Sequence, residues 1–586
     1  MKKRKLSPFL AVFHLIPLIF KHSPLLIFFY AMLTLLVSVL SGLTVYTNQY
    51  FYDSLIGVIS ENGAITEAVI GAAVMLLIMI VVQIFGKTNG FIWVHLGDKI
   101  EFSLMYEYNK KIAEVSAVSF EDTEFLESIE KAHDGIYGAI GMFATICEII
   151  LYFGGYFAIT GVYLWHVQPV LLFALVIVFI PTAITTMLQS KMYAEEADEV
   201  ITLRRKVNSD MGAALNPRET RLFGVFDFFY GRIFTTQKAI FCRKWETEKK
   251  NCNIQLALNL CKMIGWCGIV LLMISELIKG RITVGVFAAV YTSMGTMFAN
   301  CESLLSRIKV DISENLGMME DFINFLYTPL GSSKEAEVDM KKGIQVKNIS
   351  FAYPGVEKNA VDNVSLTLSF GETVAIVGEN GSGKTTLAKL LCGLYPPDKG
   401  EVLIGGIDSS TVRAEELFSN TSAVFQDYVR YSSLSLSENV RIGDYKKEDD
   451  INFALQLTGA VASCTLENGY DTIMSREFDG MELSGGQWQR IAMTRGLYRS
   501  HDLIFLDEPT AAIDPLEESN IYKMFASIAK DKACVLITHR LGSARIADRI
   551  FVMDGGHIVE SGTHEELIYQ GGRYEKMWKA TADWYQ

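Results

Sequence analysis

Several features typical of common protein classes are scarce or absent in this sequence of 586 residues. It has only 12 prolines and no low-complexity tract, which argues against long disordered regions. None of its nine cysteines forms a C-x-x-C pair, and most lie in apolar stretches, so the sequence predicts neither a cysteine metal site nor a disulfide framework. Basic residues are outnumbered, with 53 Lys and Arg against 66 Asp and Glu, and the net charge of −13 disfavours nucleic acid as a partner.

What is abundant is apolar sequence: half of the residues are hydrophobic while a fifth are charged, which indicates an apolar part joined to a soluble one. The chain is also too long for one ordinary domain.

It begins with a basic run, residues 1–5, followed by a mostly apolar stretch to Phe20. Pro17 and Lys21 border or interrupt that stretch, and no small-residue cleavage site follows. We therefore expect residues 1–23 to form an amphipathic helix at the membrane surface rather than a signal peptide.

Six stretches in the N-terminal half are apolar enough to span a membrane, which takes roughly 20 residues. They are residues 25–46, 64–85, 137–162, 170–188, 254–277 and 284–305. The sequence therefore predicts an all-α transmembrane domain of six helices over residues 24–328.

The connections between these stretches alternate in length and charge. The short ones are residues 47–63, 163–169 and 278–283, and the long ones, rich in Lys and Arg, are residues 86–136 and 189–253. The positive-inside rule places the long connections, and with six crossings both termini, in the cytoplasm. Helical patterning, as in residues 120–126, predicts that the membrane helices extend into the cytoplasm and end in short helices that touch the soluble part. Two solvated helical hairpins are the alternative.

Two ionisable residues fall inside the apolar stretches: Glu148 in the third and Lys262 in the fifth. Such groups are costly at membrane depth and usually face a cavity or one another. We expect them to line a translocation cavity or to pair across it. A position near a helix end, with the charged group reaching to the membrane surface, is the alternative.

A polar, turn-like linker is expected over residues 329–342, and a strand-rich domain over residues 343–586. Within that domain the apolar run 373–377 leads into Gly378, Glu379, Asn380, Gly381, Ser382, Gly383, Lys384, Thr385 and Thr386. This is G-x-x-x-x-G-K-T between a strand and a helix, the context of a phosphate-binding loop. Its glycines let backbone N–H groups point at phosphate oxygens, Lys384 would neutralise the β- and γ-phosphates, and the Thr385 hydroxyl would ligate Mg²⁺.

Two adjacent carboxylates follow a second apolar run. Residues 503–506 predict a buried parallel strand, and Asp507 and Glu508 stand at its carboxyl end, where ligands bind in such sheets. One carboxylate can hold Mg²⁺, and its neighbour can activate the attacking water as a general base. We assign the metal to Asp507 and the base to Glu508. An acidic turn before Pro509 is the alternative.

The segment Leu483-Ser484-Gly485-Gly486-Gln487 lies between these two elements. It resembles the signature motif of ABC transporters, and its position between the phosphate loop and Asp507 follows the family's order. The resemblance covers nearly the whole chain, which looks like an exporter-type half-transporter: a membrane domain fused to a cassette. It implies an α/β P-loop NTPase fold with an antiparallel β subdomain and a helical signature subdomain. It also implies ATPase activity, with ATP and Mg²⁺ as cofactors.

The resemblance assigns further residues to the nucleotide. Tyr353 is similar to the aromatic residue that stacks on adenine, with a strand-end core tyrosine as the alternative. Gln426 resembles the glutamine that reaches Mg²⁺, and Asp514 lies in the loop that crosses between cassettes. His539 resembles the histidine that contacts the γ-phosphate, and it joins Glu508 and Lys384 as catalytic.

The resemblance also implies a dimer, because the family's signature segment closes over the ATP of a partner cassette. Ser484, Gly485, Gly486 and Gln487 would supply that contact. Since the chain has one phosphate loop and one signature, it needs a second half-transporter, identical or different. Two segments depart from the family pattern: Ala511-Ala512-Ile513-Asp514 lacks a common serine, and residues 475–480 replace a Gly-Glu-Arg-Gly-like stretch. Both departures concern contacts between cassettes rather than hydrolysis.

The signature continues through Trp488, which is similar to what many bacterial peptide exporters carry. We therefore expect ATP-driven export of a peptide or an amphipathic small molecule across the bacterial cytoplasmic membrane. No Cys occurs before Cys147, so no leader-cleaving Cys-protease domain is expected. An importer on the same fold, a lipid flippase and an ATP-gated channel are alternatives. A soluble ATPase acting on nucleic acid is opposed by the six apolar stretches and the negative charge.

Overall fold

The structure, a computed structural model, describes residues 8–60, 63–215, 217–328, 335–460, 468–510, 513–528 and 532–583. Its contacts divide the chain into two units. The first, here called the membrane unit, comprises residues 1–111 and 128–328; the second, the cassette unit, comprises residues 112–127 and 329–586. The basic run at residues 1–5 and the first part of the predicted linker, residues 329–334, lie outside the described residues.

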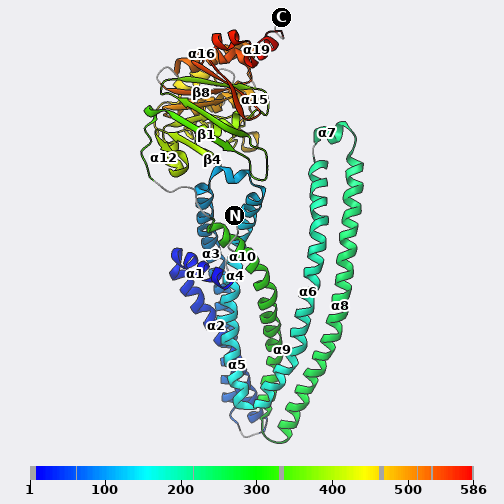
Figure 1. The fold of residues 1–586 in the computed structure, drawn as a ribbon. Helices are drawn as coiled ribbons and strands as arrows, with labels where there is room; N and C mark the ends of the chain where they lie inside the picture. Colours follow the sequence, from blue (N-terminus) through cyan, green and yellow to red (C-terminus); the bar gives the residue numbers. More distant parts are fainter. Residues whose placement is uncertain are drawn as a thin grey trace. The chain divides into compact units, whose positions relative to one another are not determined.

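The membrane unit is built of long helices (Figure 1). Its helical segments are α1 (Pro8–His22), α2 (Pro24–Ile59), α3 (Ile65–Glu114), α4 (Thr123–Cys147), η2 (Glu148–Phe153), α5 (Gly154–Val167), α6 (Pro169–Ala214), α7 (Pro217–Leu222), α8 (Phe226–Ile278), α9 (Val284–Ser306), η3 (Arg307–Asp311) and α10 (Ile312–Leu326). Each of the six predicted apolar stretches falls, to within a residue, inside one continuous helix, the third inside the helix that runs through α4, η2 and α5.

Five of these segments are long and apolar enough to cross a membrane: α2, α3, the continuous helix from α4 to α5, α8 and α9. The fourth predicted stretch lies in α6, whose apolar part includes Pro169–Thr185. The helix continues well beyond it as polar sequence to Ala214. The long segments show that the chain is a multi-pass membrane protein, with helices that outrun the roughly 20 residues a span requires.

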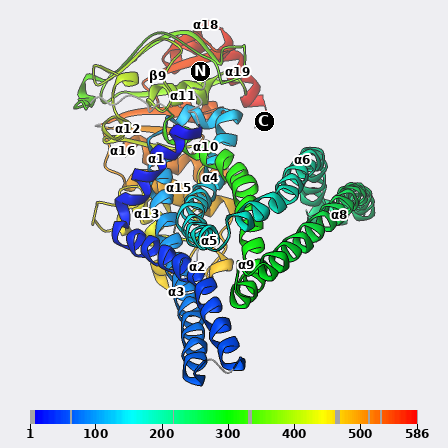
Figure 2. The ribbon, with the colours of Figure 1, turned by 90° about the horizontal axis from the view of Figure 1, so that it is seen from below.

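Beyond their apolar parts, α6 and α8 pack side by side and are joined at their ends by α7 (Figures 1 and 2). A small apolar cluster of Val200, Val207 and Ile240 lies between them. Ion pairs between α6 and α8 add to this apolar contact, among them Arg232 with Asp210 at 3.1 Å and Arg243 with Glu199 at 2.6 Å. The second long predicted connection, residues 189–253, is therefore a helical hairpin continuous with two membrane helices.

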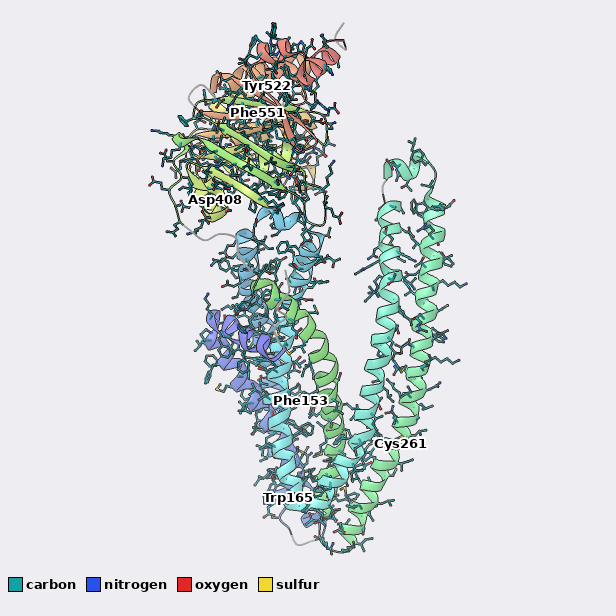
Figure 3. All side chains as sticks on the ribbon, in the orientation of Figure 1. Phe153, Trp165, Cys261, Asp408, Tyr522 and Phe551 are labelled. Carbon is teal, nitrogen blue, oxygen red and sulfur yellow. The ribbon has the colours of Figure 1, made fainter. Side chains whose placement is uncertain are left out.

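Two π-helical turns interrupt otherwise continuous helices of the membrane unit. The first, η2, joins α4 to α5 and the second, η3, joins α9 to α10. Figure 3 labels Phe153 at the end of η2, and Trp165 near the far end of α5. A π turn carries one more residue than an α turn, so each changes the direction in which the following side chains point.

Helix α4 packs against α10 through glycines. A Cβ atom at Gly138 would lie 2.4 Å from the Cβ of Met318, and one at Gly135 would lie 2.4 Å from the Met318 carbonyl oxygen. The backbones therefore approach closely at these two positions, where any larger residue would force the helices apart.

The first helix, α1, is apolar on two faces. Ala11, Leu15 and Ile19 follow one another at four-residue intervals and are buried, whereas Phe13 and Phe20 are exposed. One face thus packs on the membrane unit, chiefly on α10. The other is the apolar surface that an interfacial helix would present to lipid, so the expected surface position stays a prediction.

The cassette unit contains two sheets. Its strands are β1 (Ile344–Phe351), β2 (Val361–Leu368), β3 (Thr373–Gly378), β4 (Lys399–Ile404), β5 (Ile407–Asp408), β6 (Thr421–Val424), β7 (Leu503–Asp507), β8 (Ala533–Ile537), β9 (Arg549–Asp554) and β10 (His557–Gly562). The smaller sheet is antiparallel in the order β2-β1-β4-β5, and the larger has the order β10-β9-β3-β8-β7-β6. In the larger sheet all neighbours from β9 to β6 are parallel, and β10 is antiparallel to β9.

Helices of the cassette unit cover the sheets and form a separate subdomain around the signature segment. They are α11 (Lys384–Leu391), α12 (Ala414–Phe418), α13 (Leu436–Arg441), α14 (Asn452–Thr458), α15 (Gly485–Tyr498), α16 (Pro515–Ile528), α17 (Leu541–Ala544), α18 (His564–Gln570) and α19 (Arg573–Asp583). β3, β7 and β8 are buried at every residue, as expected of parallel strands covered on both faces. The predicted α/β fold with an antiparallel subdomain and a helical signature subdomain is confirmed.

Candidate functional site

The predicted phosphate loop joins β3 to α11, in the strand–loop–helix context expected of it. Gly383 has φ +100°, and a Cβ there would lie 2.3 Å from the Ala360 carbonyl oxygen. A Cβ at Gly378 would lie 2.4 Å from the Met553 carbonyl oxygen. Neither position can hold a side chain, and the loop therefore keeps its tight course around the start of α11.

Lys384 lies inside this loop and is 6% exposed. Its ammonium donates hydrogen bonds to the carbonyl oxygens of Gly378 at 3.0 Å and Glu379 at 2.8 Å. Burial lowers the pKa of Lys384, an effect opposed by the nearby charges of Glu508 and Asp507. The ammonium is thus held where phosphate oxygens could take the place of the two carbonyls.

The Ser382 hydroxyl, in the same loop, is buried and has no hydrogen-bond partner among the described residues. A buried hydroxyl without a partner is costly, so such an atom in a phosphate-binding loop fits a site built for a ligand with oxygen acceptors. Glu379, which is exposed, pairs instead with Arg573 of α19 at 3.2 Å. No motif pointed to Arg573, because it lies almost 200 residues further along the chain.

Oxygen ligands for a divalent cation converge at the ends of β7 and the phosphate loop. The Thr385 hydroxyl oxygen lies 3.5 Å from Asp507 Oδ1, and Asp507 is 2% exposed. Burial raises the pKa of Asp507 to about 6, the Thr385 hydroxyl opposes that rise, and the adjacent Glu508 charge adds to it. Gln426 is exposed two residues beyond β6, the strand next to β7. A hydroxyl and a carboxylate are ligands that Mg²⁺ prefers, so these residues fit that ion.

Glu508 and His539 are brought together by the parallel pairing of β7 and β8. Glu508 follows β7 with φ +47°, and its backbone N–H donates to the Ile537 carbonyl oxygen at 3.0 Å. Its carboxylate oxygen Oε1 lies 2.7 Å from His539 Nδ1. A glutamate in the left-handed region is uncommon and strained, and such residues cluster at active sites. The pair can therefore orient a water and accept its proton.

Gln489 also contacts this region and was not predicted. It lies on α15 and its side-chain amide donates to the Glu508 carbonyl oxygen at 3.3 Å. The signature helix is thus linked to the backbone of Glu508 within one chain. Only its position two residues after Gln487 could have drawn attention to it.

Tyr353 lies near the phosphate loop, where its hydroxyl is 3.0 Å from the Thr386 hydroxyl oxygen. Its ring meets the rings of Phe351 and Tyr395 edge to face, with centroids 5.3 and 6.2 Å apart. This half-buried aromatic beside the start of α11 offers a surface for a base. The stacking of adenine on Tyr353 stays a prediction.

The signature segment forms the start of α15. Ser484 caps this helix: its hydroxyl accepts from the Gln487 N–H at 3.3 Å, while the Gln487 side chain accepts from the Ser484 N–H at 2.8 Å. The cap and the amides of Gly485 and Gly486 form a helix N-terminus suited to an anion. Trp488 is 4% exposed and packs in the core of the signature subdomain.

Asp514 is exposed just before α16, and its carbonyl oxygen accepts hydrogen bonds from the N–H groups of Glu517 and Glu518.

Of the two departures from the family pattern, Ala511 and Ala512 lie outside the described residues. The other forms a short turn, Arg476–Phe478, followed by Asp479 at φ +56°. Asn380 and Gly381 are exposed at the tip of the phosphate loop.

A segment between the membrane helices α3 and α4 belongs to the cassette unit. Ala117 and Val118, in the short helix η1 (Ala117–Glu121), pack against the apolar core that the two sheets of the cassette unit share. Glu121 accepts a hydrogen bond from the Tyr395 hydroxyl and pairs with Lys389 of α11 at 3.3 Å. The Tyr395 hydrogen bond, with the Lys389 charge, holds the pKa of Glu121 below its usual value. This is the contact with the soluble part that the helical patterning predicted.

The membrane unit contains a cavity of about 610 Å³. Its charged lining residues are Glu148, Arg307 and Asp311. Glu148 thus lines a cavity as expected, and pairs there with Arg307 at 2.8 Å. Lys262 is not among the lining residues and pairs with Glu302 of α9. The two ionisable residues singled out from the sequence therefore have separate partners.

Comparisons with known proteins agree with this arrangement. A sequence model described as "ABC transporter" matches residues 361–511. The subtilin transport ATP-binding protein SpaT of Bacillus subtilis is 32% identical over 367 residues, which are 61% of this chain and 60% of that protein. The nisin transport ATP-binding protein NisT of Lactococcus lactis is 24% identical over 574 residues, 94% of this chain and 93% of that protein.

A solved structure has the same fold along almost the whole chain. It is that of a bacterial Atm1-family ABC exporter with ATP bound, with a TM-score of 0.79 and 22% sequence identity. The match covers 94% of this chain and 97% of the other. The long helices of the membrane unit and the two sheets of the cassette unit are therefore those of an exporter-type fold.

Proposed function

We propose that this chain, a member of the ABC transporters with the fold of their exporters, is one half of a dimer that uses ATP to export a peptide. The observation that carries the proposal is the arrangement of Lys384, Asp507, Glu508 and His539 at the carboxyl ends of β3, β7 and β8. A phosphate-binding lysine, a metal-binding carboxylate and a carboxylate–histidine pair are the parts that hydrolysis of a nucleoside triphosphate requires.

Within one chain, each residue has a distinct task in this proposal. Lys384 exchanges its two carbonyl partners for β- and γ-phosphate oxygens, and the loop amides and the Ser382 hydroxyl hold the phosphates in place. Thr385, Asp507 and Gln426 would hold Mg²⁺, which neutralises charge on the phosphates when bound. Glu508 accepts the proton of the attacking water, and His539 fixes the position of its carboxylate. Tyr353 would stack on the base.

The partner chain completes the site. Ser484 and the amides of Gly485 and Gly486 form an anion-binding helix start, and Gln487 holds it in shape. In the proposed dimer this helix start closes over the γ-phosphate held by the other copy, and Asp514 faces the same interface. ATP then stabilises the closed pair because only that pair contacts the phosphates from both sides.

Closure would reach the membrane unit through η1. Because Glu121 is held by Lys389 of the phosphate-loop helix and by Tyr395, movement of the cassette carries residues 117–121 with it. These residues connect directly to α3 and α4. Both termini, the cassette and η1 are placed in the cytoplasm, as the positive-inside rule predicts.

The substrate class is supported by the relatives. The protein matched over most of this chain's length is named for nisin transport, and the one with the higher identity is named for subtilin transport. We therefore assign a peptide as the exported molecule. Whether the two halves are identical or different is decided by whether the chain purified alone is active.

The test uses the purified chain in inside-out membrane vesicles, with a fluorescent peptide outside. We expect ATP with Mg²⁺ to drive peptide into the vesicles, and Glu508→Gln to abolish uptake while Glu401→Gln, on an exposed pair with Lys347, leaves it unchanged. Uptake in right-side-out vesicles instead would make the protein an importer. Movement of a fluorescent phospholipid with no peptide uptake would make it a flippase.

A further inference from the structure

The cavity of the membrane unit has the size and lining of a small ligand site. At about 610 Å³ it lies within the range of roughly 300–1,000 Å³ typical of pockets that enclose a drug-sized molecule. Tyr30 and Tyr152 contribute aromatic rings to its wall, and Asn89 and Asn300 contribute amides. It can therefore take a few side chains of an extended peptide, but not a folded one.

Both π-helical turns of the membrane unit face this cavity. Within the described residues such turns occur as η2 and η3, and they supply every charged lining residue: Glu148 from η2, and Arg307 and Asp311 from η3. π turns are rare, and they occur frequently at functional sites. Two of them on neighbouring helices, each directing charge into one space, are difficult to explain by packing alone.

The charges in the cavity do not balance. The Arg307 guanidinium lies 2.8 Å from Glu148 Oε2 through one terminal nitrogen and 2.8 Å from Asp311 Oδ2 through the other. One cation is thus shared by two carboxylates, which leaves an excess of one negative charge among the charged lining residues. The side chains of both carboxylates are partly exposed, Glu148 by 32% and Asp311 by 28%. They can accept a further donor without losing their helix positions.

We propose that this cavity binds a protonated amine of the exported peptide between Glu148 and Asp311, in competition with Arg307. An ammonium offers three donors and one positive charge, which matches the two carboxylates and the excess negative charge. The rings of Tyr30 and Tyr152 add a surface that attracts cations. An anionic group would meet two carboxylates around a guanidinium that is already paired, so the same lining disfavours it.

This inference rests on the proposed export function, because it names the chemistry of the molecule exported. The amine could belong to a lysine side chain or to the N-terminus of the peptide. Both sources carry an ammonium group. Acetylation of lysine removes the charge of the first source, and acetylation of the N-terminus removes the charge of the second.

The test measures equilibrium binding of a short fluorescent peptide to the purified, nucleotide-free protein in lipid nanodiscs. The peptide contains lysine and phenylalanine and is compared with forms acetylated on lysine, acetylated on the N-terminus, or succinylated to carry negative charge. We expect Glu148→Gln and Asp311→Asn each to weaken binding of the cationic peptide by about tenfold or more, the usual effect of losing a charge-assisted hydrogen bond. Acetylation of whichever amine binds should have a similar effect.

Two further variants make the test specific. Arg307→Gln removes the competing cation, so it should tighten binding of the cationic peptide rather than weaken it. Glu302→Gln is the matched control, because Glu302 lies at the end of α9, shortly before η3, but pairs with Lys262 and does not line the cavity. It should leave binding unchanged. Each variant is first checked for elution as an intact protein.

The outcomes separate this inference from the proposed function. Equal binding of all four peptides, or tighter binding of the succinylated one that Arg307→Gln abolishes, overturns the amine site while leaving ATP-driven export intact. Preference for the cationic peptide, lost in Glu148→Gln, supports the site. If that preference persists in a protein that neither hydrolyses ATP nor transports, the export proposal fails and the binding site stands.

Discussion

The two units of this chain hold their charged groups in different ways. In the cassette unit, burial disfavours the ionised forms of two groups: it raises the pKa of Asp507 to about 6 and lowers the pKa of Lys384. In the membrane unit, Arg307 is already shared by Glu148 and Asp311. In the proposed mechanism the cassette site is completed by an incoming metal and phosphate, whereas the proposed ligand of the membrane cavity has to compete with a residue already in place.

This difference has a functional consequence. In the proposed mechanism, nucleotide binding adds charge where the protein lacks compensation, so it can be tight and can drive closure of the cassettes. In the proposed cavity site, substrate binding exchanges one ion pair for another, so it can be weak enough for the substrate to leave. A transporter needs both properties, because the substrate has to be released in every cycle.

The largest expected effect is a loss of ATP hydrolysis by the cassette unit. Glu508→Gln should lower ATP hydrolysis by about 10²–10⁴-fold, the usual contribution of a general base, without loss of ATP binding. Phosphate release and binding of a fluorescent ATP analogue measure the two quantities. Glu401→Gln, a surface carboxylate paired with Lys347, serves as the control. Hydrolysis at the unmodified rate in Glu508→Gln would remove Glu508 from the mechanism.

A second experiment tests whether the buried carboxylate of Asp507 binds Mg²⁺. Because the pKa of Asp507 is raised to about 6, this group is mostly ionised at pH 7 and mostly protonated at pH 5. Mg²⁺ needs the ionised form, so the gain in ATP affinity on adding Mg²⁺ should fall roughly tenfold between pH 7 and pH 5. Asp507→Asn controls for titration of ATP itself and should show little gain at either pH. An equal gain at both pH values in the unmodified protein would contradict the assignment.

The contact of η1 within the cassette unit gives a smaller effect. Glu121→Gln removes the charge that Lys389 and Tyr395 hold. Amide hydrogen exchange of residues 112–127 should then become about tenfold faster, since a charge-assisted hydrogen bond is lost. Glu124→Gln changes an exposed carboxylate of the same segment and should have little effect. Identical exchange in both variants would mean that the apolar contacts of Ala117 and Val118 hold the segment alone.

The smallest effect concerns packing of the membrane unit. Gly138→Ala places a methyl group 2.4 Å from the Met318 Cβ, and overpacking of this kind costs roughly 1–3 kcal/mol. The protein should lose its folded state a few degrees earlier in a heating series in detergent. Gly161→Ala, where no atom lies within 4 Å, is the matched control and should not be destabilised. Equal stability of both variants would show that α4 and α10 can separate freely.

The residues of the cassette site could be predicted because their chemistry is local in sequence. Lys384 stands in a contiguous loop, and Asp507 and Glu508 directly follow an apolar strand. The partners that came from distant parts of the chain were missed. Gln489 and Arg573 reach the site only through the packing of α15 and α19, which no short pattern records.

In the membrane unit, the sequence predicted the apolar stretches but not their register. Glu148 was noticed because it is charged within an apolar run. Its partner Arg307 lies two residues beyond the sixth predicted stretch, where a basic residue looks ordinary. The two side chains meet where two π turns lie, and no local sequence pattern predicted either turn.

The central claim is that ATP bound to Lys384 of one copy is completed by Ser484 of the other, and mixing two inactive variants tests it most directly. Lys384→Ala and Ser484→Arg each disable both sites of their own dimer. A mixed dimer, purified through two different tags, would carry both defects in one site and leave the other site intact. The account predicts that this mixed dimer hydrolyses ATP well above either parent. A mixed dimer as inactive as its parents, alongside an active mixture of unmodified chain with the double variant, would contradict it.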